Sequence, residues 1–344
     1  MNRHVYVMPE VGRVELAEQP LPEPEAGQVQ IEMGWSLISP GTEVALIGGK
    51  LQPWAPLPFP LGYSASGRVR KVGPDVECLA PGDEVAAVTP HANCANVAIG
   101  NVYPLPAGVS PERGATINLG IIVMQAVRKA RIEPGESVVI VGMGLIGQLA
   151  MQVCRVAGGH PVIAVERDAG RCELARRAGA DHVLEADGDW HSRLLDLLPD
   201  RNRNGADVVI EATGDPEPIN AAFAATARMG RVVLLGSTRG QGRVDWYRDV
   251  HKKGLTILGA HQKTVPAHEC QPGLWPERAE GETWLRLIGA GRLDPVPVLT
   301  DRIAARDAPG TYRQLLDGDL KSIGILLDWR GFNRGVTTGS GDGI

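Results

Sequence analysis

The feature that most constrains the fold is a glycine-rich turn between an apolar strand and a helix. The run reads Ser137-Val-Val-Ile-Val-Gly-Met-Gly-Leu-Ile-Gly147, and its β-branched first half is typical of a buried parallel strand. Gly142 permits a tight turn, Gly144 lets the backbone approach a pyrophosphate, and Gly147 lets the next helix pack closely on the sheet. The pattern predicts an α/β domain with a doubly wound parallel sheet that binds a dinucleotide.

A helix over residues 146–157 follows the turn, and its N-terminal N–H groups and dipole favour phosphate. A second strand over 161–165 ends at Glu166, 19 residues after the last glycine, where a carboxylate would bind the adenosine ribose hydroxyls. Because this carboxylate repels a 2′-phosphate, Glu166 favours NAD over NADP. Arg167 keeps NADP open, since a guanidinium can grip a phosphate, although a solvated arginine is the plainer interpretation.

Composition excludes several other classes of protein. The chain has 344 residues, 43% of them apolar and 22% charged, which indicates a soluble protein of two domains. A net charge of −5 without a basic cluster argues against nucleic acid as a partner. No apolar run approaches the ~20 residues of a membrane helix, and the N-terminus lacks a signal-peptide core. The five cysteines form no C-x-x-C pair, which favours a reduced, cytoplasmic location.

The composition and the pattern of predicted elements change near residue 121. Residues 1–120 are rich in proline and glycine, and their strand-like runs at 28–33, 67–72 and 84–88 predict antiparallel strands. After residue 121, helices and strands alternate, as a doubly wound sheet requires. The predicted later elements are strands at 206–211, 231–236, 255–259 and 322–327, and helices at 218–228, 282–290 and 308–316.

Four further motifs make the chain resemble the medium-chain dehydrogenase/reductase superfamily, which includes zinc alcohol dehydrogenases, polyol dehydrogenases and quinone reductases. They are Pro81-Gly-Asp-Glu-Val85, Pro134-Gly-Glu-Ser-Val138, Gly205-Ala-Asp-Val-Val-Ile-Glu-Ala-Thr-Gly214 and Gly230-Arg-Val-Val-Leu-Leu-Gly236. The resemblance covers residues 3–329.

The resemblance implies a GroES-like, β-rich substrate domain built from residues 1–120 and 261–330, and a Rossmann domain over 121–260. Residues 331–344 are predicted to be a disordered tail. The relatives form dimers through edge strands of the nucleotide-binding sheet, so residues 231–236 and 255–259 are candidates for a homodimer contact. The candidate cofactor-binding residues are Gly142, Gly144, Leu145, Ile146, Gly147, Glu166, Arg167, Thr213 and Gly236.

The chain departs from the family at all three catalytic zinc ligands. Pro40 stands where zinc members have a thiolate, Tyr63 replaces an imidazole and Ser64 the following carboxylate. Asn118 aligns with the third ligand. A catalytic zinc needs about three donors from thiolate, imidazole or carboxylate groups. The cysteine-rich lobe that holds a structural zinc is also missing, so we identify the chain as a zinc-free member with no metal ligands.

Without zinc, side chains must manage the proton that accompanies hydride transfer. Thr42 matches the family's proton-relay hydroxyl, Glu43 follows it, and Tyr63 replaces a ligand that faces the substrate. His91 lies on a loop that approaches the substrate in relatives, and imidazole titrates near neutral pH. His261 and Lys263 are weaker candidates.

Each catalytic candidate also has a plainer interpretation. Thr42 can be a hydroxyl bonded within a turn, and Tyr63 a packed aromatic ring. His91 can be a surface histidine, and Glu43 a buried carboxylate paired with an arginine.

Three functions remain open at this stage. The first is an NAD-dependent oxidoreductase that acts on a secondary alcohol or ketone, such as a polyol, sugar, cyclitol or hydroxyethyl tetrapyrrole. The second is a reductase of conjugated C=C bonds, of the enone or quinone type, which generally uses NADPH. The third is a nucleotide-binding relative without catalytic activity. The substrate is in every case a small molecule, and the sequence does not name it.

Overall fold

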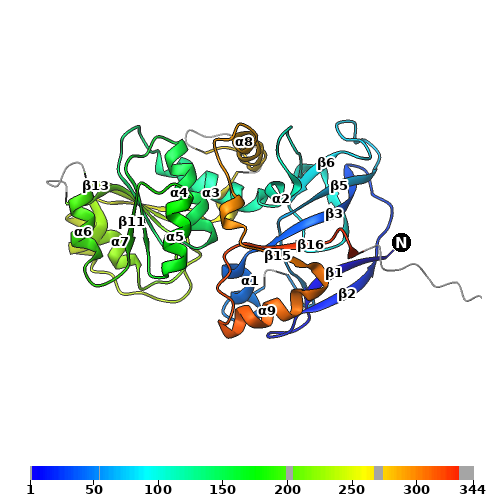
Figure 1. The fold of residues 1–344 in the computed structure, drawn as a ribbon, viewed down its shortest axis with the longest axis horizontal. Helices are drawn as coiled ribbons and strands as arrows, with labels where there is room; N and C mark the ends of the chain where they lie inside the picture. Colours follow the sequence, from blue (N-terminus) through cyan, green and yellow to red (C-terminus); the bar gives the residue numbers. More distant parts are fainter. Residues whose placement is uncertain (1, 54, 199–203, 267–273, 333–344) are drawn as a thin grey trace, which may run out of the picture. The chain divides into compact units, whose positions relative to one another are not determined.

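The computed structural model describes residues 2–53, 55–198, 204–266 and 274–332 (Figure 1). The chain divides into two compact units, one of residues up to 117 and from 299 onward, the other of residues 118–298. The first boundary lies close to the predicted one. The return to the first unit comes at residue 299 and not at 261, because helix α8 (Glu277–Gly289) packs Trp284 so tightly on Gly120 that a Cβ there would lie 2.3 Å from the indole ring.

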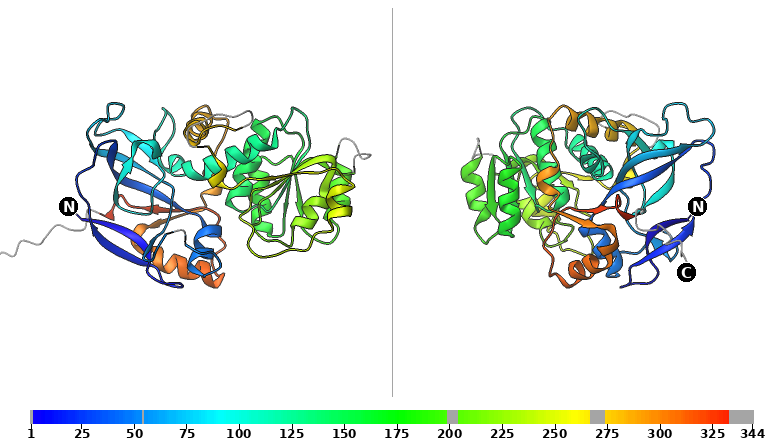
Figure 2. Two further views of the ribbon diagram at one scale, coloured as in Figure 1. Left: turned by 180° about the vertical axis from the view of Figure 1, so that it is seen from behind. Right: turned by 45° about the vertical axis from the view of Figure 1, so that its right-hand side comes forward.

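The second unit contains the predicted doubly wound sheet. Among the described residues, six parallel strands run in the order β11-β10-β9-β12-β13-β14 (Figures 1 and 2). The strands are β9 (Val138–Val141), β10 (Val162–Glu166), β11 (His182–Glu185), β12 (Ala206–Glu211), β13 (Thr226–Leu234) and β14 (Thr256–Gly259). The helices are α3 (Ile117–Ala130), α4 (Leu145–Val156), α5 (Ala169–Arg177), α6 (Trp190–Leu197) and α7 (Ile219–Ala225), with a six-residue π-helical turn at Trp246–His251.

Helices cover both faces of this sheet. Phe223 of α7 and Leu194 of α6 pack on the face that carries Val139 and Ile163, while α4 and α5 lie on the other side (Figure 1). The central strand β9 is buried along its whole length, as its continuous β-branched run predicts. The chain leaves β9 toward β10 and later returns to its other side as β12. Ligands of open α/β sheets bind where the strand order reverses in this way.

The first unit is built mainly from antiparallel strands. Its larger sheet runs β15-β16-β3-β5-β6-β8, with β7 also paired to β3, and its smaller one runs β2-β1-β4. The strands are β1 (Asn2–Met8), β2 (Glu15–Pro20), β3 (Gln28–Ile38), β4 (Phe59–Pro60), β5 (Ala65–Val72), β6 (Glu84–Ala87), β7 (Cys94–Ala98), β8 (Val102–Pro104), β15 (Asp301–Ala304) and β16 (Ile325–Asp328). The helices are α1 (Pro40–Ile47), α2 (Pro111–Gly114) and α9 (Ala308–Asp317).

The strands predicted from alternating residues at 28–33, 67–72 and 84–88 are present as β3, β5 and β6, and they pair antiparallel. Helix α1 was not predicted, although proline at its first position favours a helix start. The predicted tail lies outside the described residues from 333 onward. Of its first residues, Phe332 packs against the core and against Trp329, so order extends further than the composition predicts.

No helix in the described part of the chain is both long and apolar enough to cross a membrane.

Candidate active site

The glycine turn after β9 has the geometry that its sequence predicts. Gly142 has φ +94°, a conformation that favours glycine, and a Cβ on it would lie 2.7 Å from Cγ2 of Thr213. A Cβ on Gly147 would lie 1.9 Å from the carbonyl oxygen of Gly142, so only glycine fits there. A Cβ on Gly144 would meet nothing within 4 Å. The backbone at Gly144 therefore faces open space at the start of α4.

Helix α4 begins directly after Gly144, and no side chain caps its N-terminus. The first N–H groups of a helix have no acceptor within the helix. Leu145, Ile146 and Gly147 supply these groups here. An uncapped helix N-terminus beside an open glycine turn matches the needs of a pyrophosphate.

Glu166 ends β10, next to the turn, and is only 6% exposed. Its Oε2 accepts a hydrogen bond from the N–H of Met143 at 2.8 Å. Its Oε1 accepts from the N–H groups of Arg167 (2.8 Å) and Asp168 (3.1 Å). These bonds hold the carboxylate against the glycine turn. Arg167 is exposed, and a guanidinium nitrogen of Arg171 lies 3.9 Å from Glu166 Oε2.

Thr213 and Gly236 follow the carboxyl ends of β12 and β13, and Thr213 contacts Gly142. A Cβ on Gly236 would lie 2.4 Å from the backbone nitrogen of Gly214. The Thr213 hydroxyl donates to Glu211 Oε1 and accepts from the N–H of Asp215 at 3.1 Å. The hydroxyl hydrogen of Thr213 is therefore already donated to Glu211.

Glu211 is fully buried at this edge, and its Oε2 has no hydrogen-bond partner in the described part of the chain. Burial raises the pKa of this carboxyl above its ordinary value of 4.5, although its bonds from Thr213 act in the opposite direction. An orphaned buried oxygen and a cradle of glycines together fit a dinucleotide that completes this edge. Gly142, Gly144, Leu145, Ile146, Gly147 and Glu166 are the residues that would hold it.

In the first unit, Glu43 is the centre of a buried polar network. It lies in the first turn of α1 and is 1% exposed. Its Oε1 accepts from the N–H of Ser39 at 2.7 Å, and its Oε2 accepts from the Tyr312 hydroxyl. His91 Nε2 lies 3.1 Å from the same oxygen. The alternative of an arginine partner for Glu43 is wrong, because the carboxylate is bonded to a tyrosine and a histidine.

His91 is fully buried, so the alternative of a surface histidine is also wrong. Its Nδ1 lies 2.8 Å from Oγ of Ser36, which accepts a hydrogen bond from Nε1 of Trp329 at 2.9 Å. A Cβ on Gly62 would lie 2.4 Å from the imidazole, so this ring packs directly on the loop that carries Tyr63.

Thr42 and Tyr63 are both only partly buried, unlike Glu43 and His91. Thr42 precedes Glu43 in α1, and Tyr63 follows Gly62. Their side chains can therefore meet a small molecule, whereas the buried pair cannot do so directly. Tyr63 also contributes, after burial and Glu43, to raising the pKa of Tyr312 well above its ordinary value of 10.0.

The positions that would hold zinc offer poor ligands. Pro40 is at the N-terminus of α1 and has no donor atom in its side chain. The amide of Asn118 is paired with that of Gln262, each donating to the other at 3.4 and 2.7 Å. In the described ranges no three His, Cys, Asp or Glu side chains lie together as a metal site would require. The residues present do not fit a catalytic zinc.

The segment after β14 is tied to α3. Gln125 donates to the carbonyl of Ala260 at 2.5 Å, and Lys129 donates to Thr264 at 2.5 Å and to the carbonyl of Gly259 at 3.1 Å. This fixes the stretch that carries His261 and Lys263. The His261 ring accepts from the N–H of Lys263 at 3.1 Å, which stabilises the local turn.

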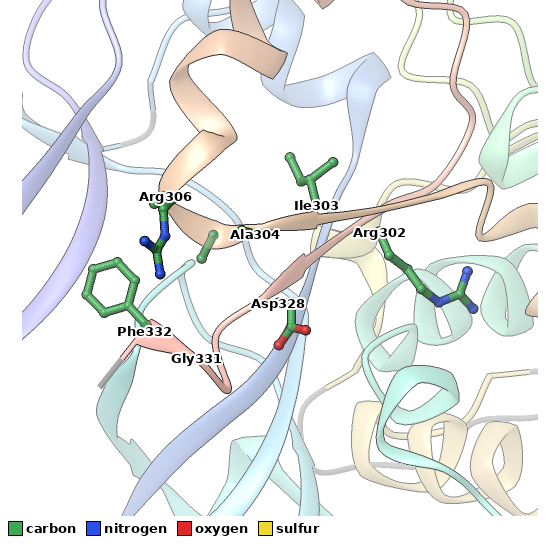
Figure 3. Close-up of a pocket in the computed structure, with 8 residues that line it drawn as sticks. Arg302, Ile303, Ala304, Arg306, Asp328, Gly331 and Phe332 are labelled. Carbon is green, nitrogen blue, oxygen red and sulfur yellow. The ribbon is translucent and has the colours of Figure 1, made fainter. Parts of the chain in front are cut away.

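A small pocket of about 170 Å³ lies in the first unit beside β15 and β16 and contains no predicted site residue (Figure 3). Arg306 and Phe332 lie close together on one side, and Arg302 points away from them (Figure 3). Arg302 pairs with Glu112, and Asp328 pairs with Arg330.

Three members of the network around Glu43 were missed from the sequence. Ser36, Tyr312 and Trp329 come from β3, α9 and the residue after β16. No sequence motif identifies these three residues, because one is a serine in an apolar strand and the other two are aromatic residues in a typical core pattern.

Two family models match the chain. Residues 25–105 match the alcohol dehydrogenase GroES-like domain, and residues 146–277 match the zinc-binding dehydrogenase model. A D-guloside 3-dehydrogenase from Shigella flexneri is 29% identical over 264 residues, which cover 75% of this chain and 74% of that protein. An L-threonine 3-dehydrogenase from Pyrococcus furiosus is 29% identical over 342 residues, which cover 87% and 90%. The crystal structure of galactitol-1-phosphate dehydrogenase from Escherichia coli superposes with a TM-score of 0.82 at 22% identity, covering 94% of this chain and 99% of that one.

Proposed function

Because the chain belongs to the medium-chain dehydrogenase/reductase superfamily, and is therefore a nicotinamide-dependent oxidoreductase, we propose that it oxidises a secondary alcohol with NAD and without zinc. The substrate class is a polyol, sugar or cyclitol, or the hydroxyethyl group of a tetrapyrrole. The similarity to a D-guloside 3-dehydrogenase and an L-threonine 3-dehydrogenase supports an alcohol over a conjugated double bond, since both names describe oxidation of a hydroxyl group.

The observation that carries the choice of NAD is the Glu166 carboxylate, buried against the glycine turn by three backbone N–H groups. A carboxylate held there accepts hydrogen bonds from ribose hydroxyls and repels a 2′-phosphate. Arg167 and Arg171 are the competing features. We expect Glu166→Ala to weaken NADH binding on the order of tenfold and to improve binding of NADPH. A wild-type preference for NADPH would mean that the arginines outweigh the carboxylate.

Zinc independence rests on the chemistry of the donor positions. Pro40 has no donor, and the Asn118 amide is occupied by Gln262. We expect protein purified without chelator to contain no stoichiometric zinc, and its turnover to survive a strong chelator. One bound zinc per chain would contradict the proposal.

The two partly exposed side chains are the proposed catalytic groups. NAD, when bound, supplies the hydride acceptor. We propose that the Thr42 hydroxyl and the Tyr63 phenol hydrogen-bond the reacting oxygen, and that each takes up its proton only as it passes its own hydroxyl hydrogen on to solvent water. Thr42→Val and Tyr63→Phe should therefore each lower kcat by about 10²-fold or more while leaving the Kd for NADH within about twofold. Unchanged turnover in both variants would remove them from this role.

The direct test is a substrate panel of polyols, sugars, cyclitols, hydroxyethyl tetrapyrroles and enones, each followed through nicotinamide absorbance with NAD and NADP. Oxidation of an alcohol with NAD supports the proposal. Consumption of NADPH with enones alone favours the double-bond reductase. Binding of nucleotide without turnover of any compound favours a non-catalytic relative.

We also propose a homodimer in a reducing, cytoplasmic environment. Strand β13 lies between β12 and β14 in the described sheet, so of the two predicted contact strands only β14 presents a free edge. Exposed Met229, Trp246 and Tyr247 belong to β13 and to the turn that precedes β14, and apolar surface of this kind supports an interface. Sedimentation of the purified chain tests this, and a monomer at micromolar concentration would contradict it.

A further inference from the structure

The network around Glu43 permits only one placement of its hydrogen atoms. The Trp329 indole can only donate, so Ser36 Oγ must accept from it at 2.9 Å. Besides Trp329, the Ser36 side chain has one further partner among the described residues, Nδ1 of His91 at 2.8 Å. The Ser36 hydrogen must therefore be donated to Nδ1, which acts as an acceptor.

An acceptor at Nδ1 leaves the imidazole hydrogen on Nε2, which faces Glu43 Oε2 at 3.1 Å. The carboxylate then accepts three hydrogen bonds, from His91, from Tyr312 and from the N–H of Ser39. A doubly protonated imidazolium, or a hydrogen on Nδ1 alone, would strand the Ser36 hydroxyl hydrogen at a site with no exposed surface. The same placement gives every other donor in the network an acceptor.

The network contacts both proposed catalytic segments. Glu43 fixes the first turn of α1, in which Thr42 is the preceding residue. The His91 ring packs on Gly62, which precedes Tyr63, and the N–H of His91 donates to the carbonyl of Leu61 at 2.8 Å. Each end of the His91–Glu43 pair thus holds one of the two segments.

We propose that His91 is held as the neutral Nε2–H tautomer, and that His91, Glu43 and Tyr312 are positioning residues that set the places of Thr42 and Tyr63 and exchange no proton with substrate. The identification of Thr42 and Tyr63 as the groups being positioned rests on the proposed function. The His91 tautomer and the fixed position of the Leu61–Tyr63 loop do not rest on the proposed function. Two further titratable side chains, Tyr6 from β1 and Tyr63, also raise the pKa of Tyr312, less than burial and Glu43 do.

The first experiment needs no substrate. The ring nitrogens of the full chain with ¹⁵N-labelled histidine are observed by NMR at neutral pH. We expect His91 to show one protonated nitrogen at Nε2 and one unprotonated nitrogen at Nδ1. Two protonated nitrogens, or a hydrogen on Nδ1 alone, would overturn the proposal.

The second experiment compares Tyr312→Phe with a matched control, Tyr6→Phe. Both remove one buried hydroxyl from the same core, but the Tyr6 hydroxyl donates to the Ala305 carbonyl, outside the network. We expect amide hydrogen exchange at Ser39 and His91 to accelerate at least about tenfold in Tyr312→Phe relative to the control. Equal exchange in the two variants would show that the network does not hold these segments.

A third readout applies once the substrate panel has provided an alcohol. Tyr312→Phe and His91→Gln, which keeps an N–H donor, should lower kcat while leaving the KM for NAD and the shape of the pH profile unchanged. Loss of a limb of the pH profile in His91→Gln would identify His91 as an acid–base group and contradict the positioning role. If no alcohol is turned over, the NMR and exchange results still decide the structural part.

Discussion

The two units hold their buried polar groups in different ways. In the nucleotide-binding unit, the turn from Gly142 to Gly147 presents backbone N–H groups, and the neighbouring Glu166 carboxylate is held by further backbone N–H groups. In the other unit, side chains hold side chains, from Trp329 through Ser36 and His91 to Glu43. Any sequence that forms the turn also presents its backbone N–H groups. A side-chain network, by contrast, needs particular residues from distant segments of the chain.

This difference extends to the glycines. Gly147 must lack a side chain because the backbone of Gly142 occupies the space, and a backbone cannot rotate away. Gly62 must lack one because the His91 ring occupies the space, and it also has φ +82°. The first requirement belongs to the turn itself. At Gly62 the steric part of the requirement exists only while His91 is present, and the left-handed backbone conformation favours glycine in either case.

The largest expected effect is at Gly147. A valine there would force the turn apart, because even its Cβ would lie 1.9 Å from a carbonyl oxygen. We expect Gly147→Val to lower the free energy of unfolding by more than about 4 kcal/mol and to abolish NADH binding. Gly144→Ala is the matched control, since its Cβ meets open space. Its stability should change by less than about 0.5 kcal/mol, as followed by urea unfolding, while NADH binding weakens. Equal stability of the two variants would contradict the contrast.

The second effect is at Gly62 and depends on its neighbour. Gly62→Ala should cost about 3 kcal/mol of unfolding free energy, from the left-handed backbone and from contact with the imidazole. In a His91→Ala background only the backbone part, about 1–2 kcal/mol, should remain. Urea unfolding of the four proteins in this double-mutant cycle measures the coupling. Additive costs would mean that the ring does not occupy this space.

The third effect is at Tyr312. Removing its hydroxyl takes one of three donors from a buried carboxylate, which should cost about 1.5–3 kcal/mol because the acceptor is charged. Tyr6→Phe removes a bond to a neutral carbonyl and should cost about 0.5–1.5 kcal/mol. Urea unfolding at neutral pH provides both values. A larger cost for Tyr6→Phe than for Tyr312→Phe would contradict the expectation that the bond to the Glu43 carboxylate is the stronger one.

The smallest effect is a pH dependence in the nucleotide-binding unit. Burial raises the pKa of Glu211 in the folded chain above its ordinary 4.5, so the folded state binds more protons between these two values. Stability therefore falls as pH rises through this window, and the cost persists above it. Glu211→Gln should remove the dependence and stabilise the chain slightly at neutral pH. Urea unfolding of both proteins at several pH values checks the sign. If the free energy of unfolding contributed by Glu211, relative to Glu211→Gln, rose with pH, the prediction would be contradicted.

The sequence by itself determined the doubly wound parallel sheet of the second unit and the glycine turn that follows β9. Gly142, Gly147 and Glu166 lie within 25 residues of one another, so the pattern is visible in one stretch of chain, and the turn itself requires the two glycines. The tertiary structure decided the arrangement around Glu43. His91, Tyr312 and Trp329 come from segments far apart in the sequence, and only folding showed that His91 is buried and bonded. Local chemistry can be read along the chain, but burial and partner choice depend on which segments the fold brings together.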